Sequence, residues 1–493
     1  MKINLGRRTV MLGAAMTLAL GALAFLVLGA GGILAWEYSN SNSFCVNNCH
    51  AVHPEEPRAY AVASHARVQC VECHMGRLPT LQLMTLKMGH YHELLGMITG
   101  YKRPLNATTL RPARDSCEGC HWPSVNHDDK VRTKIHFDKD EKNTEVRTRL
   151  IVHTGGGEAR TGTTRGIHWH IDQNVEYVTD DPQKRTIPWV RITDKNGKSV
   201  TYFDAASKVG RAEMDQAKKN KMECADCHNA SGHPFVNPAD RVDQAMAEGK
   251  ISRKIPSIKA RALAIIEKAS PLHGPLEQQV PQFQKIIADA APKGDLSPDA
   301  KAAEAQFAAT MLEILKLSEF EAKDLSWKSF PNHVGHKDFP GCFRCHDGKH
   351  FNDKGEAIRL QCTLCHAIPQ VWVDGNLKTV QSTIDPDEEP PKSHAGANWM
   401  REHRADDDGT CEECHGKIKM GEKGGNFCAN PACHGRTWPE LDLETQPKKS
   451  GTPAEEAAKA EAKQAAADTK KSGDGKKSDD GKKSDDGKKT SGK

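Results

Sequence analysis

Cysteine pairs followed directly by a histidine are the residues of this sequence whose types and spacing could do chemistry. Eight such sites occur, and together they use all 16 cysteines of the 493-residue chain. In the motif Cys-x-x-Cys-His, two thiols form thioethers to the haem vinyl groups and the histidine takes one axial position on the iron. Six sites have this spacing, whereas CVNNCH and CANPACH have three and four intervening residues, so their loops must bulge. The sequence therefore predicts eight covalent c-type haems.

The residues of these sites divide into attachment thiols and proximal ligands. The predicted attachment thiols are Cys45, Cys49, Cys70, Cys73, Cys117, Cys120, Cys224, Cys227, Cys342, Cys345, Cys362, Cys365, Cys411, Cys414, Cys428 and Cys433. The predicted proximal ligands are His50, His74, His121, His228, His346, His366, His415 and His434.

Two other uses of paired cysteines fit these residues less well. A zinc ribbon also contains paired Cys-x-x-Cys motifs, but zinc chemistry does not place a histidine after the second thiol of every pair. A disulfide scaffold spreads its cysteines through loops and needs no histidines. Covalent haem attachment to reduced thiols takes place outside the inner membrane, so the motifs also predict a periplasmic location for these sites.

The composition agrees with a chain wrapped around haems. Only 5% of the residues are aromatic and 37% are hydrophobic, which is low for conventional cores in a chain of this length. Haems would supply the missing apolar mass. The formal net charge is +4, and the haem propionates would make the assembled protein mildly acidic. The basic balance therefore gives no argument for a nucleic-acid partner.

An apolar run near the N-terminus predicts where the protein resides. Residues 9–36 contain no charge and, as a helix of about 42 Å, exceed the hydrocarbon core of roughly 30 Å. Arg7 and Arg8 before the run, and Glu37 after it, predict a cytoplasmic N-terminus with the haem domains outside. A cleaved signal peptide is the alternative, with small residues at 30–32, but its apolar core is usually shorter. We therefore expect an uncleaved single-pass anchor in the inner-membrane bilayer.

Residues 45–233 resemble the NapC/NirT/NrfH family of membrane-anchored tetrahaem quinol dehydrogenases. The matching features are the single anchor, a haem site directly outside the membrane, and the stretches SHARVQCVECHMGR (64–77) and CADCHNASGHPFVNP (224–238). The resemblance implies that His65 and His233 are distal ligands of neighbouring haems. The first site has one extra residue, and about 100 residues separate the third and fourth sites. Such extended chains resemble inner-membrane multihaem cytochromes of metal-reducing bacteria.

Residues 78–100 predict an amphipathic helix along the outer membrane surface. Pro79 suits a helix start, and apolar residues recur at spacings of three and four from Leu81 to Ile98. The resemblance implies that Lys87 and Glu93 lie near the quinol, where Lys87 could orient its oxygen and Glu93 accept a proton. The alternative is a plain amphipathic helix with solvated charges. His90 and His92 are either axial ligands or proton acceptors.

Distal ligands are otherwise a counting problem. Eight of the 24 histidines are proximal, so 16 remain for at most eight distal positions. A histidine a few residues past a proximal one, such as His53 or His350, is expected to serve a neighbouring haem because it must reach the opposite face. The candidates besides His65 and His233 are His53, His90, His127, His136, His153, His168, His170, His333, His336, His350, His394 and His403.

We expect a mainly α multihaem cytochrome c with little regular structure around the haems. Strands are predicted at 146–153, 165–171, 175–180, 186–194 and 195–203, with Asn196-Gly197 as a hairpin turn, in a small β-rich insertion spanning 122–223. The predicted divisions are a cytoplasmic start at 1–8, the anchor at 9–36, a tetrahaem module at 37–240, a helical spacer at 241–326, a second tetrahaem module at 327–440 and a disordered tail at 441–493.

These features predict a membrane-anchored octahaem electron carrier that oxidises quinol, menaquinol in particular. The first four haems would take the electrons and the second four would pass them to a periplasmic cytochrome or reductase. A terminal reductase is one alternative and needs an iron with an open distal side, but no Cys-x-x-Cys-Lys site occurs. A soluble periplasmic shuttle is another, and it requires that the anchor be removed. The oligomeric state stays open, a homo-oligomer included.

Overall fold

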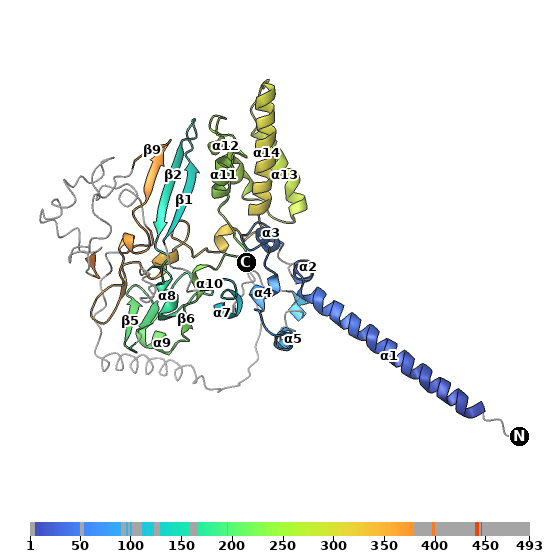
Figure 1. Cartoon of the computed structure of the whole chain (residues 1–493). Helices are drawn as coiled ribbons and strands as arrows, with labels where there is room; N and C mark the ends of the chain where they lie inside the picture. Colours follow the sequence, from blue (N-terminus) through green and yellow to red (C-terminus); the bar gives the residue numbers. More distant parts are fainter. Residues whose placement is uncertain are drawn as a thin grey trace, which may run out of the picture. The chain divides into compact units, whose positions relative to one another are not determined.

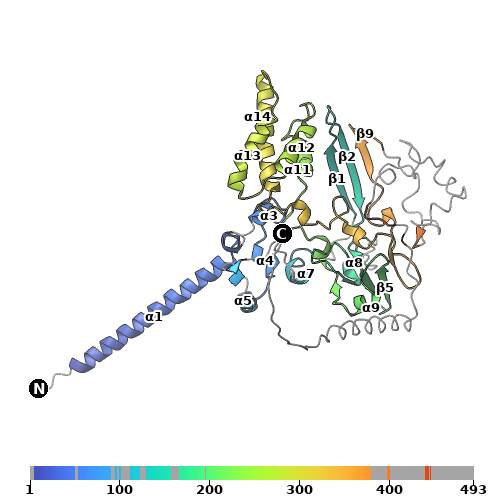
Figure 2. The ribbon, with the colours of Figure 1, turned by 180° about the vertical axis from the view of Figure 1, so that it is seen from behind.

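The computed structural model describes the parts of the chain that carry the first six predicted haem sites. These are residues 5–49, 54–89, 95–96, 99–100, 111–122, 129–156, 166–194, 196–378, 397–399, 439–442 and 445. The chain divides into two units, 1–446 and 447–493, and all described residues belong to the first. The described elements are shown from two sides in Figures 1 and 2.

A single helix covers the predicted anchor. Helix α1 spans Leu5–Asn40, and its part Ala15–Asn40 is long and apolar enough to cross a membrane, with a mean hydropathy of 2.3 and none of it buried. The helix ends where polar side chains turn back on its last turn. Ser39 Oγ and Asn40 Nδ2 both donate to the carbonyl oxygen of Trp36, at 2.8 and 3.0 Å. Residues 9–36 are therefore helical, as predicted.

Short helices follow the anchor and carry the first haem sites. Each is one to three turns long, and loops connect them. Their bounds are α2 Asn42–Phe44, the π-helical turn η1 Cys45–Cys49, α3 Glu55–Ala61, α4 Cys70–His74, α5 Thr80–Gly89 and α7 Ala113–Ser116. Helix α5 begins one residue after Pro79, which confirms the predicted start of the amphipathic helix.

Two antiparallel sheets hold the β-rich part of the chain. One has the order β1-β2-β8-β9 and the other β6-β3-β4-β5-β7. The bounds are β1 Lys130–Phe137, β2 Glu145–Val152, β3 Asn174–Val178, β4 Trp189–Thr193, β5 Ser199–Asp204, β6 Asn220–Lys221, β7 His350–Phe351, β8 Gln370–Val373 and β9 Asn376–Leu377. Strands β6, β3, β4 and β5 pair within 122–223, and strands from residue 350 onward extend both sheets.

The hairpin between β4 and β5 confirms the turn predicted at Asn196-Gly197. Thr193 pairs with Ser199, and Gly197 has a φ of +78°, a left-handed conformation that favours glycine. The strand predicted at 165–171 is wrong. Residues Trp169–Asp172 form a short helix, α8, which begins after His168. A helical turn points His168 and His170 in different directions, whereas a strand would place both on one face.

Four helices lie in the segment predicted as a helical spacer, and they form the largest hydrophobic core of the described residues. They are α11 Pro238–Ala247, α12 Ile258–Ala269, α13 Leu276–Asp289 and α14 Pro298–Ser318. Asn237 caps α11 and Ser297 caps α14, each with a proline at the first helical position. Buried Ile258, Phe283 and Leu315 pack together with Phe137 from β1, and Figure 2 shows β1 beside these helices.

The half-buried carboxyl group of Glu319 lies where α14 meets α3. Arg58 of α3 donates from Nη2 to the carbonyl of Glu319 at 3.3 Å, and Glu321 N donates to Glu55 Oε1 at 2.8 Å. Burial raises the pKa of Glu319 from 4.5 to about 7. The neutral carboxyl is therefore favoured in the folded protein over most of the range below neutrality.

We expect this carboxyl to make stability fall between about pH 4.5 and pH 7. A pKa raised by folding contributes stability that is complete below the unfolded value and is lost as the pH rises through the folded value. The contribution is of the order of 3 kcal/mol, since one pKa unit corresponds to about 1.4 kcal/mol. Glu319→Gln keeps the neutral form, so its thermal unfolding midpoint should exceed that of the wild type at pH 8 and match it at pH 4. An identical pH dependence in both proteins would contradict this assignment.

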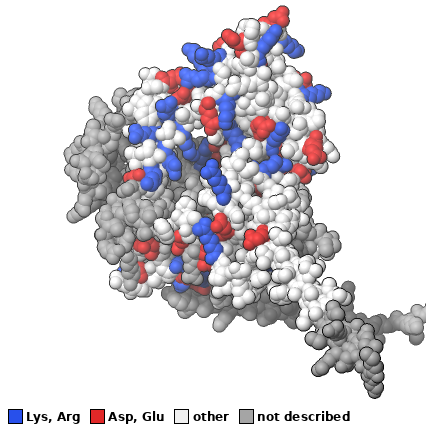
Figure 3. All heavy atoms as spheres, turned by 45° about the vertical axis from the view of Figure 1, so that its right-hand side comes forward, with Lys and Arg blue, Asp and Glu red and all other residues white. Residues whose placement is uncertain are grey.

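Charged side chains do not single out a site on the face shown in Figure 3. Over the coloured part of that face, basic and acidic side chains are interspersed, with no large field of one sign. The arrangement of thiols and imidazoles is therefore a better guide to the functional site than surface charge.

Candidate haem centres

The attachment loops in the described residues are mostly single helical turns. Sites two, four, five and six coincide with α4, α10 (Cys224–Cys227), η6 (Gly341–Arg344) and η7 (Cys362–Leu364). Capping boxes begin two of them: Gln69 with Glu72, and Glu223 with Asp226. A helical turn places residues three apart on one side, so both thiols can face the same haem edge.

Five proximal histidines face a second histidine ring at nearly constant distance. Two imidazoles on opposite sides of one iron, with metal–nitrogen bonds of about 2.0–2.1 Å as in zinc sites, have ring centroids roughly 6.3 Å apart. The observed centroid distances are His74–His233 6.2 Å, His121–His65 6.0 Å, His228–His168 6.4 Å, His346–His170 5.9 Å and His366–His336 6.3 Å. Interplanar angles vary from 20° to 85°, which ligation allows because each ring can rotate about its bond to the metal.

Hydrogen bonds prepare four of the second rings for ligation through Nε2. The Nδ1 atoms donate to backbone carbonyls: His65 to Ser231 (3.3 Å), His233 to Glu56 (3.1 Å), His168 to Thr154 (2.6 Å) and His170 to Ile167 (2.9 Å). A carbonyl oxygen only accepts, so the proton must lie on Nδ1 and the Nε2 lone pair is left for a metal. Such bonds orient metal-binding histidines and fix their tautomer.

A hollow at the second site has the lining that a haem requires. It has a volume of about 480 Å³ including open solvent, and its walls include both attachment thiols, Cys70 and Cys73, with His74 and His233. Apolar side chains such as Val46 and Val68 complete the wall. Thiols, paired imidazoles and apolar walls are the donor set and surroundings of a c-type haem.

Three other candidate histidines have different surroundings. His350 is 1% exposed and uses both ring nitrogens, Nδ1 with Asp347 Oδ1 at 2.8 Å and Nε2 with the Ile187 carbonyl at 2.7 Å. His333 Nε2 donates to the Gln183 carbonyl at 2.9 Å, and burial lowers the pKa of His333 to about 4. His136 lies on β1, where burial lowers its pKa. Because no proximal ring faces them within the described segments, we leave all three out of the proposed ligand set.

The remaining predicted site residues lie outside what the structure describes. They are His50, His53, His90, His92, Glu93, His127, His394, His403, Cys411, Cys414, His415, Cys428, Cys433 and His434, together with the side chains of Cys49 and Cys362. The candidate His153 is among the described residues, and its Nδ1 lies 2.7 Å from Asp129 Oδ2.

Thiols of consecutive sites are neighbours in space. Cys45 lies within hydrogen-bonding contact of Cys70, Cys117 of Cys224, and Cys342 of Cys365. These contacts join site one to two, three to four and five to six.

The intervening junctions are close as well. Cys73 of site two lies near Cys117 of site three, and Cys227 of site four lies near Cys342 of site five. Site two therefore lies near site three, and site four near site five, so the six sites follow one another in space in the order of the sequence.

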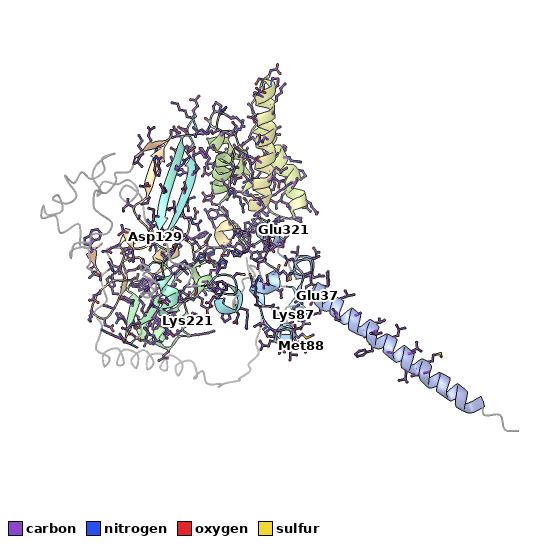
Figure 4. All side chains as sticks on the ribbon, in the orientation of Figure 1. Glu37, Lys87, Met88, Asp129, Lys221 and Glu321 are labelled. Carbon is purple, nitrogen blue, oxygen red and sulfur yellow. The ribbon has the colours of Figure 1, made fainter. Side chains whose placement is uncertain are left out.

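Lys87 lies at the end of the anchor helix. Its Nζ donates to the Ser39 carbonyl and Ser39 Oγ, both at 2.9 Å, and to Asn40 Oδ1 at 2.6 Å, and it stands 4.7 Å from the ring centroid of Trp36. Figure 4 shows Lys87 on α5 beside the end of α1 that carries Glu37. A cation is favourable at a helix C-terminus, so Lys87 ties α5 to the anchor.

Sequence reasoning missed several residues that shape the sites. Asn42 accepts a hydrogen bond from Cys70 N at 2.9 Å and donates one to Tyr60 Oη at 2.9 Å, so the first residue of α2 holds the second attachment loop. Asp226 and Arg344 occupy the variable positions inside two Cys-x-x-Cys motifs, and both are buried. The motif leaves these positions free, so no signal in the sequence marks them.

Comparisons with known proteins agree with this geometry. Residues 7–104 match the family model described as the NapC/NirT cytochrome c family, N-terminal region. The chain is 33% identical over 349 residues to the cytochrome c-type protein ImcH of Geobacter sulfurreducens, covering 69% of this chain and 67% of that protein. No solved structure matches the chain. The family model and this relative define a c-type cytochrome of electron transport with covalently bound haem.

The chain belongs to the NapC/NirT family of multihaem cytochromes. Members of this family are anchored in the membrane through an N-terminal helix, and α1 fits that role.

Proposed function

We propose that this protein is an eight-haem quinol dehydrogenase of the inner membrane. It oxidises quinol, menaquinol in particular, beside the anchor and passes the electrons in sequence order to a periplasmic cytochrome or reductase. The observation that carries this proposal is the succession of sites, because thiols of each site lie next to those of the following one from Cys45 to Cys365. Arg7 and Arg8 before the apolar run support a periplasmic location of the haem domains.

The paired histidines support electron transfer over substrate reduction at five sites. When bound, the haems supply one-electron redox chemistry, and the protein supplies ligands, spacing and orientation. His65, His168, His170, His233 and His336 each stand where a second axial ligand is required. A terminal reductase needs an open axial position, and with these histidines bound the five sites would offer none. The same proposal gives His65 and His233 the distal role that the family resemblance implies.

The quinol site is proposed beside the first haem site, where α5 meets the end of α1. Quinol oxidation releases two protons with two electrons, so it needs a group that orients the hydroxyl and a base that accepts the proton. Lys87 is the proposed orienting cation and Glu93 the proposed base. Exposed Leu81, Met84 and Met88 on α5 give the apolar surface that a quinol tail and the membrane interface require.

We expect Glu93→Gln to slow haem reduction by a menaquinol analogue about a hundredfold or more, the range in which a general base typically contributes, and Lys87→Ala to slow it as well. Stopped-flow absorbance at the haem bands measures the rate. Reduction by dithionite should be unchanged, because dithionite bypasses the quinol site, and the haem content should stay at eight.

Asn40→Ala is the matched control for Lys87→Ala. It removes the acceptor at 2.6 Å from Lys87 Nζ and leaves the cation in place. If Asn40→Ala slows the quinol reaction as much as Lys87→Ala, the ammonium acts by holding α5 against α1. Wild-type rates in all variants would remove both residues from the mechanism.

A further inference from the structure

Two charged side chains lie buried inside neighbouring attachment loops. Asp226 is the second variable residue of CADCH at site four, and Arg344 is the second variable residue of CFRCH at site five. Their exposed fractions are 4% and 7%. Burying charge in an attachment loop is costly unless the groups are fully partnered, so their partners decide their role.

Arg344 binds three separate segments with its guanidinium group. Nε donates to the Gly341 carbonyl at 2.9 Å, Nη1 to the Lys184 carbonyl at 3.0 Å, and Nη2 to the Asp226 carbonyl at 2.7 Å. The guanidinium also lies beside the sulfur atom of Cys227, an attachment residue of site four. Site five therefore reaches into the backbone and an attachment thiol of site four through one rigid side chain.

The Asp226 carboxylate accepts three hydrogen bonds from other groups. Tyr177 Oη of β3 donates to Oδ1 at 2.6 Å, Lys184 Nζ donates to the same oxygen at 2.5 Å, and Glu223 N donates to Oδ2 at 2.8 Å. Arg344 and Lys184 carry one positive charge each and Asp226 one negative charge. The cluster therefore has a net charge of +1 between the two attachment loops.

We propose that Arg344, Lys184 and Asp226 form a clamp that joins the fourth and fifth haem sites into one electron-transfer unit, and that the net charge of +1 on these three groups favours the reduced state at both sites. This proposal rests on the proposed function, since it concerns the passage from the family's four-haem part to the second group of sites. Fixed hydrogen bonds hold the loops at one separation. A buried cation stabilises an added electron nearby, because charges interact strongly where the dielectric constant is low.

The test separates charge from geometry with two substitutions of one residue. Arg344→Gln removes the cation, whereas Arg344→Lys keeps the charge and loses the three-way fork. A mediated redox titration of the purified full-length protein, followed by absorbance and EPR, should show lower midpoint potentials for two haems in Arg344→Gln. The other haems should be unchanged. In Arg344→Lys, the two potentials should return most of the way to the wild-type values.

Arg185→Gln is the matched control. Arg185 is an exposed arginine next to Lys184, and its Nη2 donates to carbonyls of Lys328 and Ser329 at 3.3 and 3.4 Å. Its loss should leave every haem potential unchanged. Unchanged potentials in an Arg344→Gln protein that carries all its haems would overturn the proposal, as would equal shifts in Arg185→Gln.

Lys184→Met tests the effect of the charge if the Arg344→Gln protein does not fold with all its haems. It removes the partly exposed cation of the same cluster, so it should lower the same two potentials by a smaller amount. No shift in a fully loaded Lys184→Met protein would overturn the charge assignment. The titration sets the potential with dithionite and mediators and does not use quinol. A protein that fails to oxidise quinol would therefore contradict the proposed function, and its haem potentials would still test the clamp.

Discussion

Replacing His168 by glycine is expected to leave one iron of the protein with a single histidine ligand. The His168 ring lies 6.4 Å from that of His228 at an interplanar angle of 20°, with Nδ1 held by the Thr154 carbonyl. Loss of an axial imidazole converts a low-spin iron to a high-spin one, so about one-eighth of the low-spin EPR signal should move. Added imidazole should restore the signal, since the substitution leaves room for it.

The haem content of this variant should stay at eight, because Cys224 and Cys227 remain. The control is His273→Gln. His273 lies between α12 and α13, and within the described residues no proximal imidazole faces it. His273→Gln should leave the spectrum of the wild type intact. A low-spin signal of full intensity in His168→Gly would show that His168 is not an axial ligand.

Removing the fourth haem site should divide the electron path into two parts. In the double variant Cys227→Ala/His228→Ala, one haem should be lost, as measured by intact mass. Quinol should then reduce the three haems of the preceding sites, whereas the four that follow should stay oxidised on the time scale of the wild-type reaction. The physical reason is that sites three and five each lie next to site four, through Cys117 and Cys342.

Cys433→Ala is the control for this experiment, because it removes a haem from the last site. Seven haems should remain in it, and quinol should reduce them all. Dithionite should reduce all remaining haems in both variants. Full reduction by quinol after loss of the fourth site, at the wild-type rate, would contradict a path that follows the order of the sequence.

Local patterns predicted the elements whose signals are short-range. The charge-free run at 9–36 predicted α1, the break at Pro79 predicted the start of α5, and Asn196-Gly197 predicted the β4–β5 hairpin. The run 165–171 failed because its alternation resembles a strand, although α8 occupies its second half. The alternating side chains there are histidines that face two different proximal rings.

Pairings between distant segments could not be predicted in the same way. Strand β8 pairs with β2 across more than 200 residues, and β7 pairs with β5, so each sheet includes strands from the second half of the chain. Hydrogen bonding in a sheet depends on which strands fold next to each other, and short strands such as β7 carry almost no signal of their own.

The sequence by itself determined the attachment chemistry. Two thiols and a histidine must lie within one turn of backbone, so Cys224, Cys227 and His228 are recognisable without any fold. Only the tertiary structure decided which histidines stand opposite. The sequence makes both His336 and His350 candidate distal ligands. In the structure, both ring nitrogens of His350 are hydrogen-bonded in a buried cluster, whereas the ring of His336 faces that of His366. The second ligand must approach the far face of the haem, so it comes from a distant segment that only folding brings there.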